Sequence, residues 1–257
     1  HQVICMSRKD PGLKLPWIKG TFASFEDLAQ VDNYQIDILV HLGAVTGGVT
    51  ERECILVNVE GTRCLLRYLM NRGCKKYVLA SSIAAVGFQD GKFRPVHLPI
   101  TDDHPCLDRS GYGISKYFME EISKYCYRQN EDMDIINLRL SSVCADDNIP
   151  PLKEISPLTQ WSLGGITIMN LTDAIRAFTM SVENPYKPGV RIMNATGPKA
   201  WTSVPVAEIL RNWWGDDVDL SYFEQLGNEY HSVYDVSRIQ QEIGFIALHT
   251  PEIITSS

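Results

Sequence analysis

"YQIDILVHLGA", residues 34–44, is a β-branched apolar run that ends in glycine, which is the pattern of a buried strand. "ERECILVNVEGTRCLLRYLMNRG" (51–73) follows with helical periodicity, and Gly73 marks the end of that helix. "KKYVLASS" (75–82) is then a second short apolar strand with a polar end. This order of strand, helix and strand predicts a parallel sheet, because neighbouring parallel strands need a crossover connection between them.

The same alternation continues toward the C-terminus. "SGYGISKYFMEE" (110–121) opens a helix whose apolar face we assign to four residues: Ile114, Phe118, Ile122 and Tyr125. The later elements that we expect are a strand at 133–143, a helix at 172–183, a strand at 189–197, a helix at 204–214, and a last helix with Asp235 as N-cap that ends at Gly244. The sequence therefore predicts an α/β fold, a doubly wound parallel sheet with helices on both faces and a smaller C-terminal lobe.

Composition limits the possible classes of protein. The chain has 257 residues, of which 44% are hydrophobic and 21% charged, as in ordinary globular proteins. Its net charge of −7 argues against nucleic acid as a partner. No apolar stretch approaches the roughly 20 residues of a membrane span, so we expect no membrane partner either. "HQVICMSRKDPG" at the start is not a signal peptide, because its apolar run is too short.

Cysteine and histidine usage indicates neither disulfides nor metal. The seven cysteines are scattered and show no C-x-x-C, which fits reduced thiols in a cytoplasmic protein. Cys64 and Cys126 fall in helical patterns and are expected in the core. The six histidines form no set with ligand spacing, so we predict no metal site.

Small and hydroxyl-bearing residues stand where the predicted strands end. Ligands of open parallel sheets bind beyond the carboxyl ends of the strands, so these residues should converge on one crevice. They are His41, Leu42, Gly43, Ala44, Ser81, Ser82, Ser141 and Ser142. Tyr112 and Lys116 open a helix beside them.

Tyr112 and Lys116 are either a proton-transfer pair or two surface residues on one helical turn. A free tyrosine has a pKa of about 10, and lowering it by about three units takes roughly 4 kcal/mol. A lysine ammonium one turn away can supply much of this by Coulomb attraction in a desolvated cleft. Together with a serine hydroxyl, the pair suits alcohol–carbonyl interconversion with a nicotinamide cofactor. Position at the crevice favours the first interpretation.

Five ordered motifs resemble one family. They are "VHLGA" (40–44), "NVEGT" (58–62), "YVLASSIAAVG" (77–87), "YGISK" (112–116) and "LRLSSV" (138–143). They are similar to motifs of the extended short-chain dehydrogenase/reductase superfamily, in its branch of NAD-dependent epimerases and dehydratases that act on sugars. The resemblance extends over nearly the whole chain, including Asp173 and a terminal "SRIQQEIGF". It implies a Rossmann-type dinucleotide-binding domain at 1–145 and a substrate lobe at 146–257, with 189–197 returning to the main sheet.

The resemblance also implies the roles of the catalytic residues. Tyr112 would be the acid/base, and Lys116 would lower its pKa and bind the nicotinamide ribose. Ser82 occupies the position of the catalytic hydroxyl. Ser81 and Ser142 are candidates for substrate contact, although Ser81 could merely end its strand.

On the cofactor side, the resemblance implies that Asn58 contacts the backbone beside the dinucleotide. The alternative is that the Asn58 side chain forms hydrogen bonds only with nearby groups of its own helix. The residues that would line the dinucleotide are Leu42, Gly43 and Ala44. Family members that prefer NAD usually carry an acid at the end of the second strand, where this chain has Ser7, Arg8 and Lys9. These two cations would attract a 2′-phosphate, so we expect NADP to bind at least as well as NAD; a solvated basic turn is the alternative.

Three departures from the family bear on the prediction. The glycine-rich phosphate loop is missing, and we expect roughly thirty residues, including such a loop, before His1 in the natural protein. Ile83 and Ala84 stand where dehydratases have an acidic pair, which argues against elimination chemistry. Ser142 replaces an asparagine that often holds a nucleotide-sugar, and uronate dehydrogenases of the superfamily also have serine there.

The sequence thus predicts an NAD(P)-dependent oxidoreductase or epimerase that acts on a secondary alcohol of a sugar or sugar nucleotide. A dehydrogenase of a small free sugar or uronic acid is one alternative, and a non-enzymatic dinucleotide-binding scaffold is another. The family also implies a homodimer through the helix of 51–73 and the helix that carries Tyr112. The residues that we expect to face outward there are Leu66, Met70, Phe118 and Tyr125.

Overall fold

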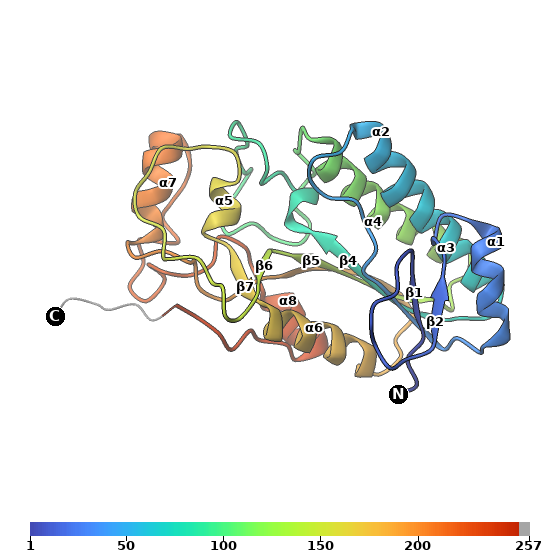
Figure 1. Cartoon of the computed structure of the whole chain (residues 1–257). Helices are drawn as coiled ribbons and strands as arrows, with labels where there is room; N and C mark the ends of the chain where they lie inside the picture. The colour runs from blue at the N-terminus through green and yellow to red at the C-terminus, as the bar shows by residue number, and fades with distance from the viewer. Residues whose placement is uncertain (252–257) are drawn as a thin grey trace.

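The main sheet has four strands, all parallel, in the order β3–β4–β5–β8. The computed structural model describes residues 1–251. The strands are β3 (Ile38–His41), β4 (Lys76–Ser82), β5 (Asp134–Leu140) and β8 (Gly189–Ala195). Helices α3 (Gly61–Met70) and α4 (Gly111–Gln129) lie on one face, and α6 (Leu171–Glu183) and α8 (Ser237–Ile243) lie on the other (Figure 1). The predicted α/β fold with a parallel, doubly wound sheet is confirmed.

The remaining elements are short strands and the helices around the sheet. The strands are β1 (Cys5–Ser7) paired with β2 (Trp17–Lys19), and β6 (Ser142–Cys144) paired with β7 (Ile168–Asn170). The helices are α1 (Phe25–Leu28), η1 (Ala29–Asn33), α2 (Glu51–Glu53), η2 (Cys54–Glu60), α3 (Gly61–Met70), η3 (Ile83–Ala85), α4 (Gly111–Gln129), α5 (Ser162–Gly165), α6 (Leu171–Glu183), α7 (Val206–Trp214), η4 (Gly215–Asp217) and α8 (Ser237–Ile243). No helix within residues 1–251 combines the length and apolar character needed to cross a membrane.

β3 forms one edge of the main sheet. Within residues 1–251, its only ladder is with β4, and β1 and β2 form a separate parallel pair. Val40 and Leu42, at the end of β3, are 41% and 63% exposed. The edge therefore presents unpaired backbone groups beside exposed apolar side chains.

The helix predicted at 51–73 forms as α2, η2 and α3 in succession. Thr50 caps it, because its hydroxyl accepts from the backbone N–H of Glu53 while the Glu53 carboxylate accepts from Thr50. The middle segment η2 is π-helical, and it contains the buried Asn58. π-Helical turns are rare and frequently occur at functional sites.

The buried face of α4 is not the apolar face predicted for it. Phe118 and Tyr125 are 40% and 41% exposed. The residues that α4 buries are Gly113, Ser115, Lys116, Met119, Glu120, Ser123 and Cys126. The prediction was wrong because several polar side chains of α4 find buried partners on other elements. Leu66 of α3 is fully buried, so its predicted outward position is also wrong.

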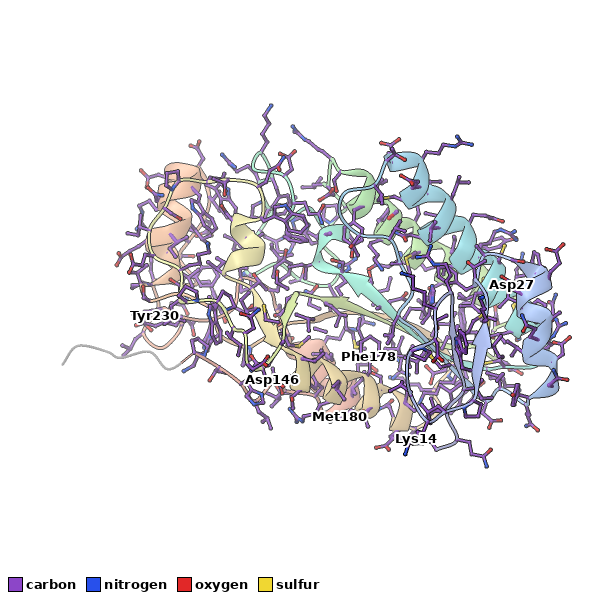
Figure 2. All side chains as sticks on the ribbon, viewed as in Figure 1. Lys14, Asp27, Asp146, Phe178, Met180 and Tyr230 are labelled. Carbon is purple, nitrogen blue, oxygen red and sulfur yellow. The ribbon has the colours of Figure 1, made fainter. Side chains whose placement is uncertain are left out.

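The C-terminal half contributes to both the sheet and a separate core. Phe178 and Met180 of α6 lie on the side of the sheet opposite α4 and pack with α8 and β8 (Figure 2). α8 begins at Ser237 with Val236 rather than Asp235 as N-cap, although Asp235 Oδ1 accepts from the Ser237 N–H at 2.8 Å. It ends at Gly244, as predicted, which has the left-handed φ of +77°.

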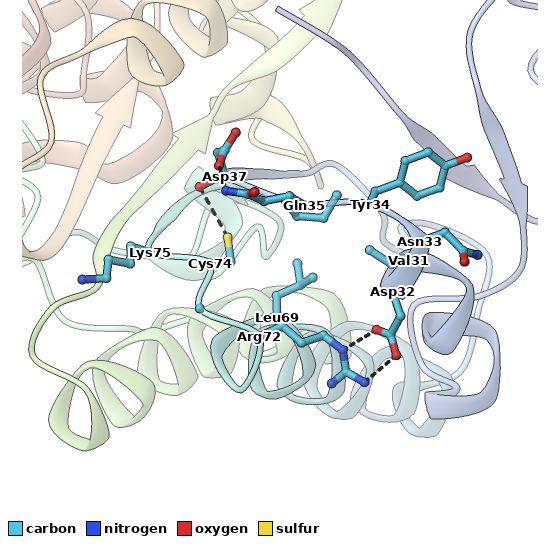
Figure 3. A pocket seen from close by; sticks show the side chains of 12 residues that line it. Val31, Asp32, Asn33, Tyr34, Gln35, Asp37, Leu69, Arg72, Cys74 and Lys75 are labelled. Atoms are coloured by element: carbon cyan, nitrogen blue, oxygen red, sulfur yellow. Dashed lines mark hydrogen bonds and ion pairs between the residues drawn. The ribbon is translucent and has the colours of Figure 1, made fainter.

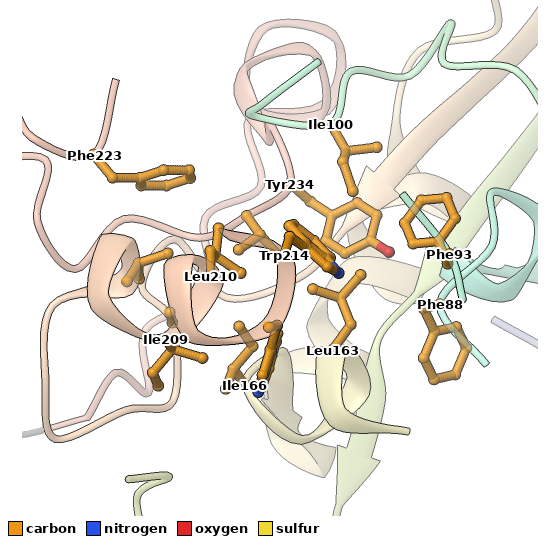
Figure 4. Close-up of a cluster of buried hydrophobic side chains, with 14 of the residues drawn as sticks. Phe88, Phe93, Ile100, Leu163, Ile166, Ile209, Leu210, Trp214, Phe223 and Tyr234 are labelled. Carbon is orange, nitrogen blue, oxygen red and sulfur yellow. The ribbon is translucent and has the colours of Figure 1, made fainter. Parts of the chain in front are cut away.

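A second hydrophobic core joins α7 to the loop after β4. Its labelled members in Figure 4 are Phe88, Phe93, Ile100, Leu163, Ile166, Ile209, Leu210, Trp214, Phe223 and Tyr234. Tyr112 packs against this cluster as a partly buried side chain. The C-terminal lobe therefore reaches the predicted catalytic helix.

Candidate active site

The ends of β3, β4 and β5 meet the beginning of α4. Ser82 is the last residue of β4 and pairs in register with Leu140 of β5. Lys116 Nζ donates to the Ala80 carbonyl oxygen at 2.8 Å, which ties α4 to β4 near its end. This is the edge of the sheet where the sequence predicts a ligand crevice.

Glycine permits the close approach of α4. A Cβ at Gly113 would lie 2.5 Å from the Ala84 carbonyl oxygen and 2.2 Å from Asp108 Cγ, which no real side chain tolerates. Ser110 caps the helix, since its hydroxyl accepts from the Gly113 N–H at 3.0 Å. Tyr112 therefore stands in the first turn of a capped helix that lies against η3.

Tyr112 contacts Ser82, and the two effects on its acidity oppose each other. Burial raises the pKa of Tyr112, and a hydrogen bond with Ser82 lowers it by less, so that the pKa lies above its usual value. Lys116 Nζ lies 5.7 Å from the centroid of the Tyr112 ring. Lys116 Nζ is bonded to the Ala80 carbonyl oxygen, and burial is the largest effect on the Tyr112 pKa, so the lowering expected from Lys116 stays a prediction.

Lys116 is itself perturbed. It is 3% exposed, and burial lowers its pKa to about 8, while the charge of Glu120 acts in the opposite direction. An ammonium in this environment exchanges its proton close to neutral pH, unlike a surface lysine.

Ser81 and Ser82 serve different partners, as neighbouring residues of a strand must. Ser82 Oγ accepts from the Ala84 N–H at 3.1 Å and reaches Tyr112. Ser81 is buried and donates to Glu120 Oε1 at 2.6 Å. Its hydroxyl lies between β4 and α4 in this structure, and its contact with substrate stays a prediction.

Ser142, the other predicted substrate contact, lies in β6 and is partly exposed. Its hydroxyl donates to the Gly164 carbonyl oxygen at 3.0 Å. The residue thereby holds α5 against β6. Its second lone pair and its partial exposure leave it able to contact a ligand.

Asn58 fastens the turn after β3 to α4. Its Oδ1 accepts from the Val45 N–H at 2.8 Å, and its Nδ2 donates to the Val45 carbonyl oxygen at 2.9 Å. The same Nδ2 donates to Ser115 Oγ at 2.9 Å, and Ser115 Oγ donates to the Tyr112 carbonyl oxygen at 2.7 Å. Ser115 is a positioning residue that the sequence analysis missed, although the serine in "YGISK" was a signal that could have identified it.

The turn predicted to line a dinucleotide is open on one side. Leu42 is 63% exposed, and Gly43 and Ala44 are partly exposed. The ring of Phe22 lies against Gly43, where a Cβ would meet it at 2.6 Å. Together with Lys116, this exposed turn fits the nicotinamide and ribose end of a dinucleotide. The 257 residues hold no glycine-rich loop after a first strand that would fit the pyrophosphate.

The predicted 2′-phosphate contacts lie at the end of β1. Ser7 Oγ donates to the Lys9 carbonyl oxygen at 2.5 Å and accepts from Trp17 Nε1 at 2.9 Å. The Ser7 hydroxyl therefore already has a donor and an acceptor within the β1–β2 region. Arg8 and Lys9 are exposed.

A hollow of about 750 Å³ lies elsewhere, at the amino ends of β3 and β4 (Figure 3). Asp32, Asp37, Arg72 and Lys75 are among its lining residues, and a two-pronged Arg72–Asp32 ion pair crosses one side of it. Because Ser82 stands at the opposite end of β4, this hollow is separate from the candidate active site.

Comparison with known proteins identifies relatives. The profile of the NAD dependent epimerase/dehydratase family matches residues 1–155. A UDP-glucose 4-epimerase 4 of Oryza sativa subsp. japonica is 37% identical over 82 residues, which are 32% of this chain and 21% of that protein. The matched part of the chain therefore spans only about a fifth of this relative's length.

Solved structures share the fold. A short-chain dehydrogenase/reductase superfamily protein of Agrobacterium tumefaciens, with bound NAD, superposes with a TM-score of 0.70 at 19% identity, covering 96% of this chain and 85% of that one. A mutated uronate dehydrogenase gives a TM-score of 0.60 at 21% identity, and the superposition covers 98% of this chain and 79% of the dehydrogenase chain. At these identities the likeness establishes the fold alone.

Proposed function

The chain belongs to the NAD dependent epimerase/dehydratase family, and from this premise we propose that it is an NAD(P)-dependent enzyme acting on a secondary alcohol of a sugar or sugar nucleotide. The observation that carries the proposal is the convergence of Ser82, Tyr112 and Lys116 at the carboxyl end of β4. A scaffold that only binds a dinucleotide has no physical need for a tyrosine, a serine and a buried lysine in one place.

Each of these side chains has a distinct task in the proposed reaction. The Ser82 hydroxyl orients the substrate oxygen toward Tyr112 Oη, which takes or returns the proton of the alcohol. Lys116 holds the ribose of the cofactor. The bound nicotinamide supplies a hydride acceptor. Because burial raises the pKa of Tyr112, its phenol is protonated at neutral pH and can donate its proton to a carbonyl oxygen. In the oxidative direction Tyr112 must first lose this proton before it can accept the proton of the alcohol.

Two substrate classes compete. Several curated relatives are UDP-glucose 4-epimerases and another is a putative UDP-arabinose 4-epimerase, which favours a nucleotide-sugar and internal return of the hydride. Ser142 in place of the family's asparagine favours a smaller free sugar or uronic acid and net oxidation. The fold shared with a uronate dehydrogenase is compatible with this second candidate.

Absorbance at 340 nm separates the candidates. The full-length natural protein is incubated with NAD or NADP and, in turn, UDP-glucose, UDP-glucuronic acid and free uronic acids. A dehydrogenase accumulates reduced cofactor, whereas an epimerase interconverts UDP-sugars without net change in absorbance, which chromatography of the products detects. If neither reduced cofactor nor an epimerised sugar forms with any of these substrates, the proposal is contradicted, and the non-enzymatic scaffold is the remaining interpretation.

We also propose a homodimer through the α2–η2–α3 helix and α4. The support is a set of exposed apolar side chains on these two helices: Leu56 at 49%, Phe118 at 40% and Tyr125 at 41%. Light scattering at micromolar concentration tests it, with Phe118→Glu expected to give monomers and Leu226→Glu, at a 99% exposed position in the loop before α8, as the control. A monomeric wild-type mass would refute the dimer.

A further inference from the structure

Ser81, Glu120 and Arg139 form a buried polar network between β4, α4 and β5. Glu120 Oε1 accepts from Ser81 Oγ at 2.6 Å, and Arg139 donates to both Glu120 oxygens at 2.8 Å. Glu120 is fully buried and Arg139 is 4% exposed. The remaining Arg139 nitrogen, Nη1, donates to the Asp102 carbonyl oxygen at 2.8 Å. The network is fully bonded, yet none of its side chains has a part in the proposed proton transfer.

The network lies directly behind Lys116. Glu120 follows Lys116 by four residues on α4, so the two side chains share the buried face of the helix. Lys116 Nζ is bonded to the carbonyl oxygen of Ala80, and the next residue, Ser81, is bonded to Glu120. Two successive residues of β4 thus hold the lysine and the carboxylate.

We propose that Glu120, held in place by Ser81 and Arg139, is a positioning residue that keeps Lys116 charged and seated on β4. This inference rests on the proposed function only for the role of Lys116. Burial lowers the pKa of Lys116 and so favours its neutral form, whereas the Glu120 carboxylate one turn away raises this pKa and favours the charged form. The hydrogen bonds from Ser81 and Arg139 hold the Glu120 carboxylate in one position on the buried face of α4.

The other titratable groups near Lys116 and Tyr112 do not replace Glu120. His41 of β3 is buried and its pKa is lowered to about 3, so it is neutral. The pKa values of Tyr112 on α4 and Cys54 of η2 are both raised, so both are uncharged at neutral pH. Arg139 of β5 is a cation, but it is paired with Glu120.

A purely structural role is the alternative. Buried ion pairs often hold elements together without any effect on a neighbouring active site, and removing one partner then lowers stability alone. A structural role leaves the titration of Lys116 unchanged. The protonation state of Lys116 is therefore the readout that separates the two roles.

Glu120→Gln tests the proposal, with Glu121→Gln as the matched control. Glu121 is the next residue of α4 and pairs with Lys124 at the surface. Two readouts are followed: the titration midpoint of Lys116 by NMR of ¹³Cε-labelled lysine, and the alkaline limb of kcat/KM. Glu120→Gln should move both to lower pH by about one unit, the effect of losing a nearby opposite charge. Glu121→Gln should move neither.

Glu120→Gln leaves Arg139 unpaired in the core and can unfold the protein, so two further variants accompany it. Glu120→Gln with Arg139→Met removes both charges, and Ser81→Ala removes only the hydroxyl that orients Glu120. Both should shift the midpoint in the same direction, Ser81→Ala by less. An unchanged Lys116 midpoint in the variants that fold overturns the proposal. The NMR readout needs no turnover, so it decides this inference even if the proposed activity fails.

Discussion

Asn58 Nδ2 donates to Ser115 Oγ over 2.9 Å, and this hydrogen bond joins the turn after β3 to the start of α4. The two residues are 57 positions apart in the sequence. The same amide group satisfies both backbone groups of Val45. One buried side chain therefore sets the position of the turn after β3 relative to Tyr112.

Asn58→Ala should destabilise the protein by about 2–4 kcal/mol, because it leaves the Val45 N–H and carbonyl oxygen without their buried partner. It should also weaken cofactor binding, since the turn at 42–45 loses its attachment to α4. Urea unfolding and calorimetry measure the two effects. Asn71→Ala, at the exposed end of α3, is the control and should change neither. Stability equal to that of the control would show that Val45 finds other partners.

Tyr112→Phe should lower turnover by about two orders of magnitude or more, because it removes the transferable proton and keeps the ring. Cofactor affinity should change little, since Lys116 and the turn after β3 are untouched. Tyr117→Phe is the matched control, being a partly buried tyrosine five residues further along α4. Steady-state kinetics with the best substrate from the panel provides the measurement. Near-wild-type turnover in Tyr112→Phe would remove this residue from the mechanism.

How much of this site could be predicted depends on the kind of signal. The strands at Ile38–His41 and Lys76–Ser82 are apolar runs that need no knowledge of their neighbours. The buried face of α4 could not be predicted in this way. Periodicity predicts that apolar residues face inward. Glu120 is buried because Ser81 of β4 and Arg139 of β5 form hydrogen bonds with its carboxylate, and these partners lie before and after α4 in the sequence.

The sequence also does not predict which of Ser81 and Ser82 faces Tyr112 and which faces Glu120. Their position at a strand end predicts a site, and the alternation of a strand predicts that they face opposite ways. Which serine faces Tyr112 depends on the placement of α4, and that placement depends on Gly113 and on the Lys116–Ala80 hydrogen bond. Contacts of this kind appear only once the chain is folded.

Asp102 should make stability depend on pH between about 4 and 6. Burial raises its pKa from 3.8 to about 6, so the folded state binds a proton more tightly than the unfolded state. This contribution is fully present below pH 3.8 and is lost as the pH rises through 6, by up to about 3 kcal/mol. Asp102→Asn keeps an acceptor for the Asn194 N–H and should flatten this slope.

Urea unfolding at pH 4, 5, 6 and 7 measures the slope for the wild type and for Asp102→Asn. Asp103→Asn is the neighbouring control. The pKa of Asp103 is lowered, mainly by its hydrogen bond with Thr101, so this carboxylate stabilises the fold at neutral pH and that contribution is lost only as the pH falls toward and below 3.8. Asp103→Asn should therefore offset the curve between pH 4 and 7 without changing its slope. Parallel curves for the wild type and Asp102→Asn would mean that Asp102 titrates normally.

Arg8 should favour NADP. It is exposed at the end of β1 beside Lys9, where a 2′-phosphate would meet two cations. We expect NADP to bind at least as tightly as NAD, and Arg8→Ala to weaken NADP by about tenfold while leaving NAD nearly unchanged. Calorimetry on the full-length natural protein measures both, with Lys14→Ala, on the exposed β1–β2 connection, as the control. A clear NAD preference in the wild type would reject this assignment.

A polypeptide made of residues 1–257 alone should be poorly soluble and should bind NADP weakly. Within residues 1–251, β3 has one paired side only, and open strand edges with exposed apolar side chains template aggregation. Its 257 residues also lack a glycine-rich turn whose backbone N–H groups could hold a pyrophosphate at a helix N-terminus. Val40→Lys, which places a charge on the edge strand, should raise solubility without restoring binding. Light scattering and calorimetry on both polypeptides test this. If the unmodified polypeptide is monodisperse and binds NADP at micromolar concentration, the edge of β3 is protected in another way and the pyrophosphate is held by residues other than a glycine-rich turn.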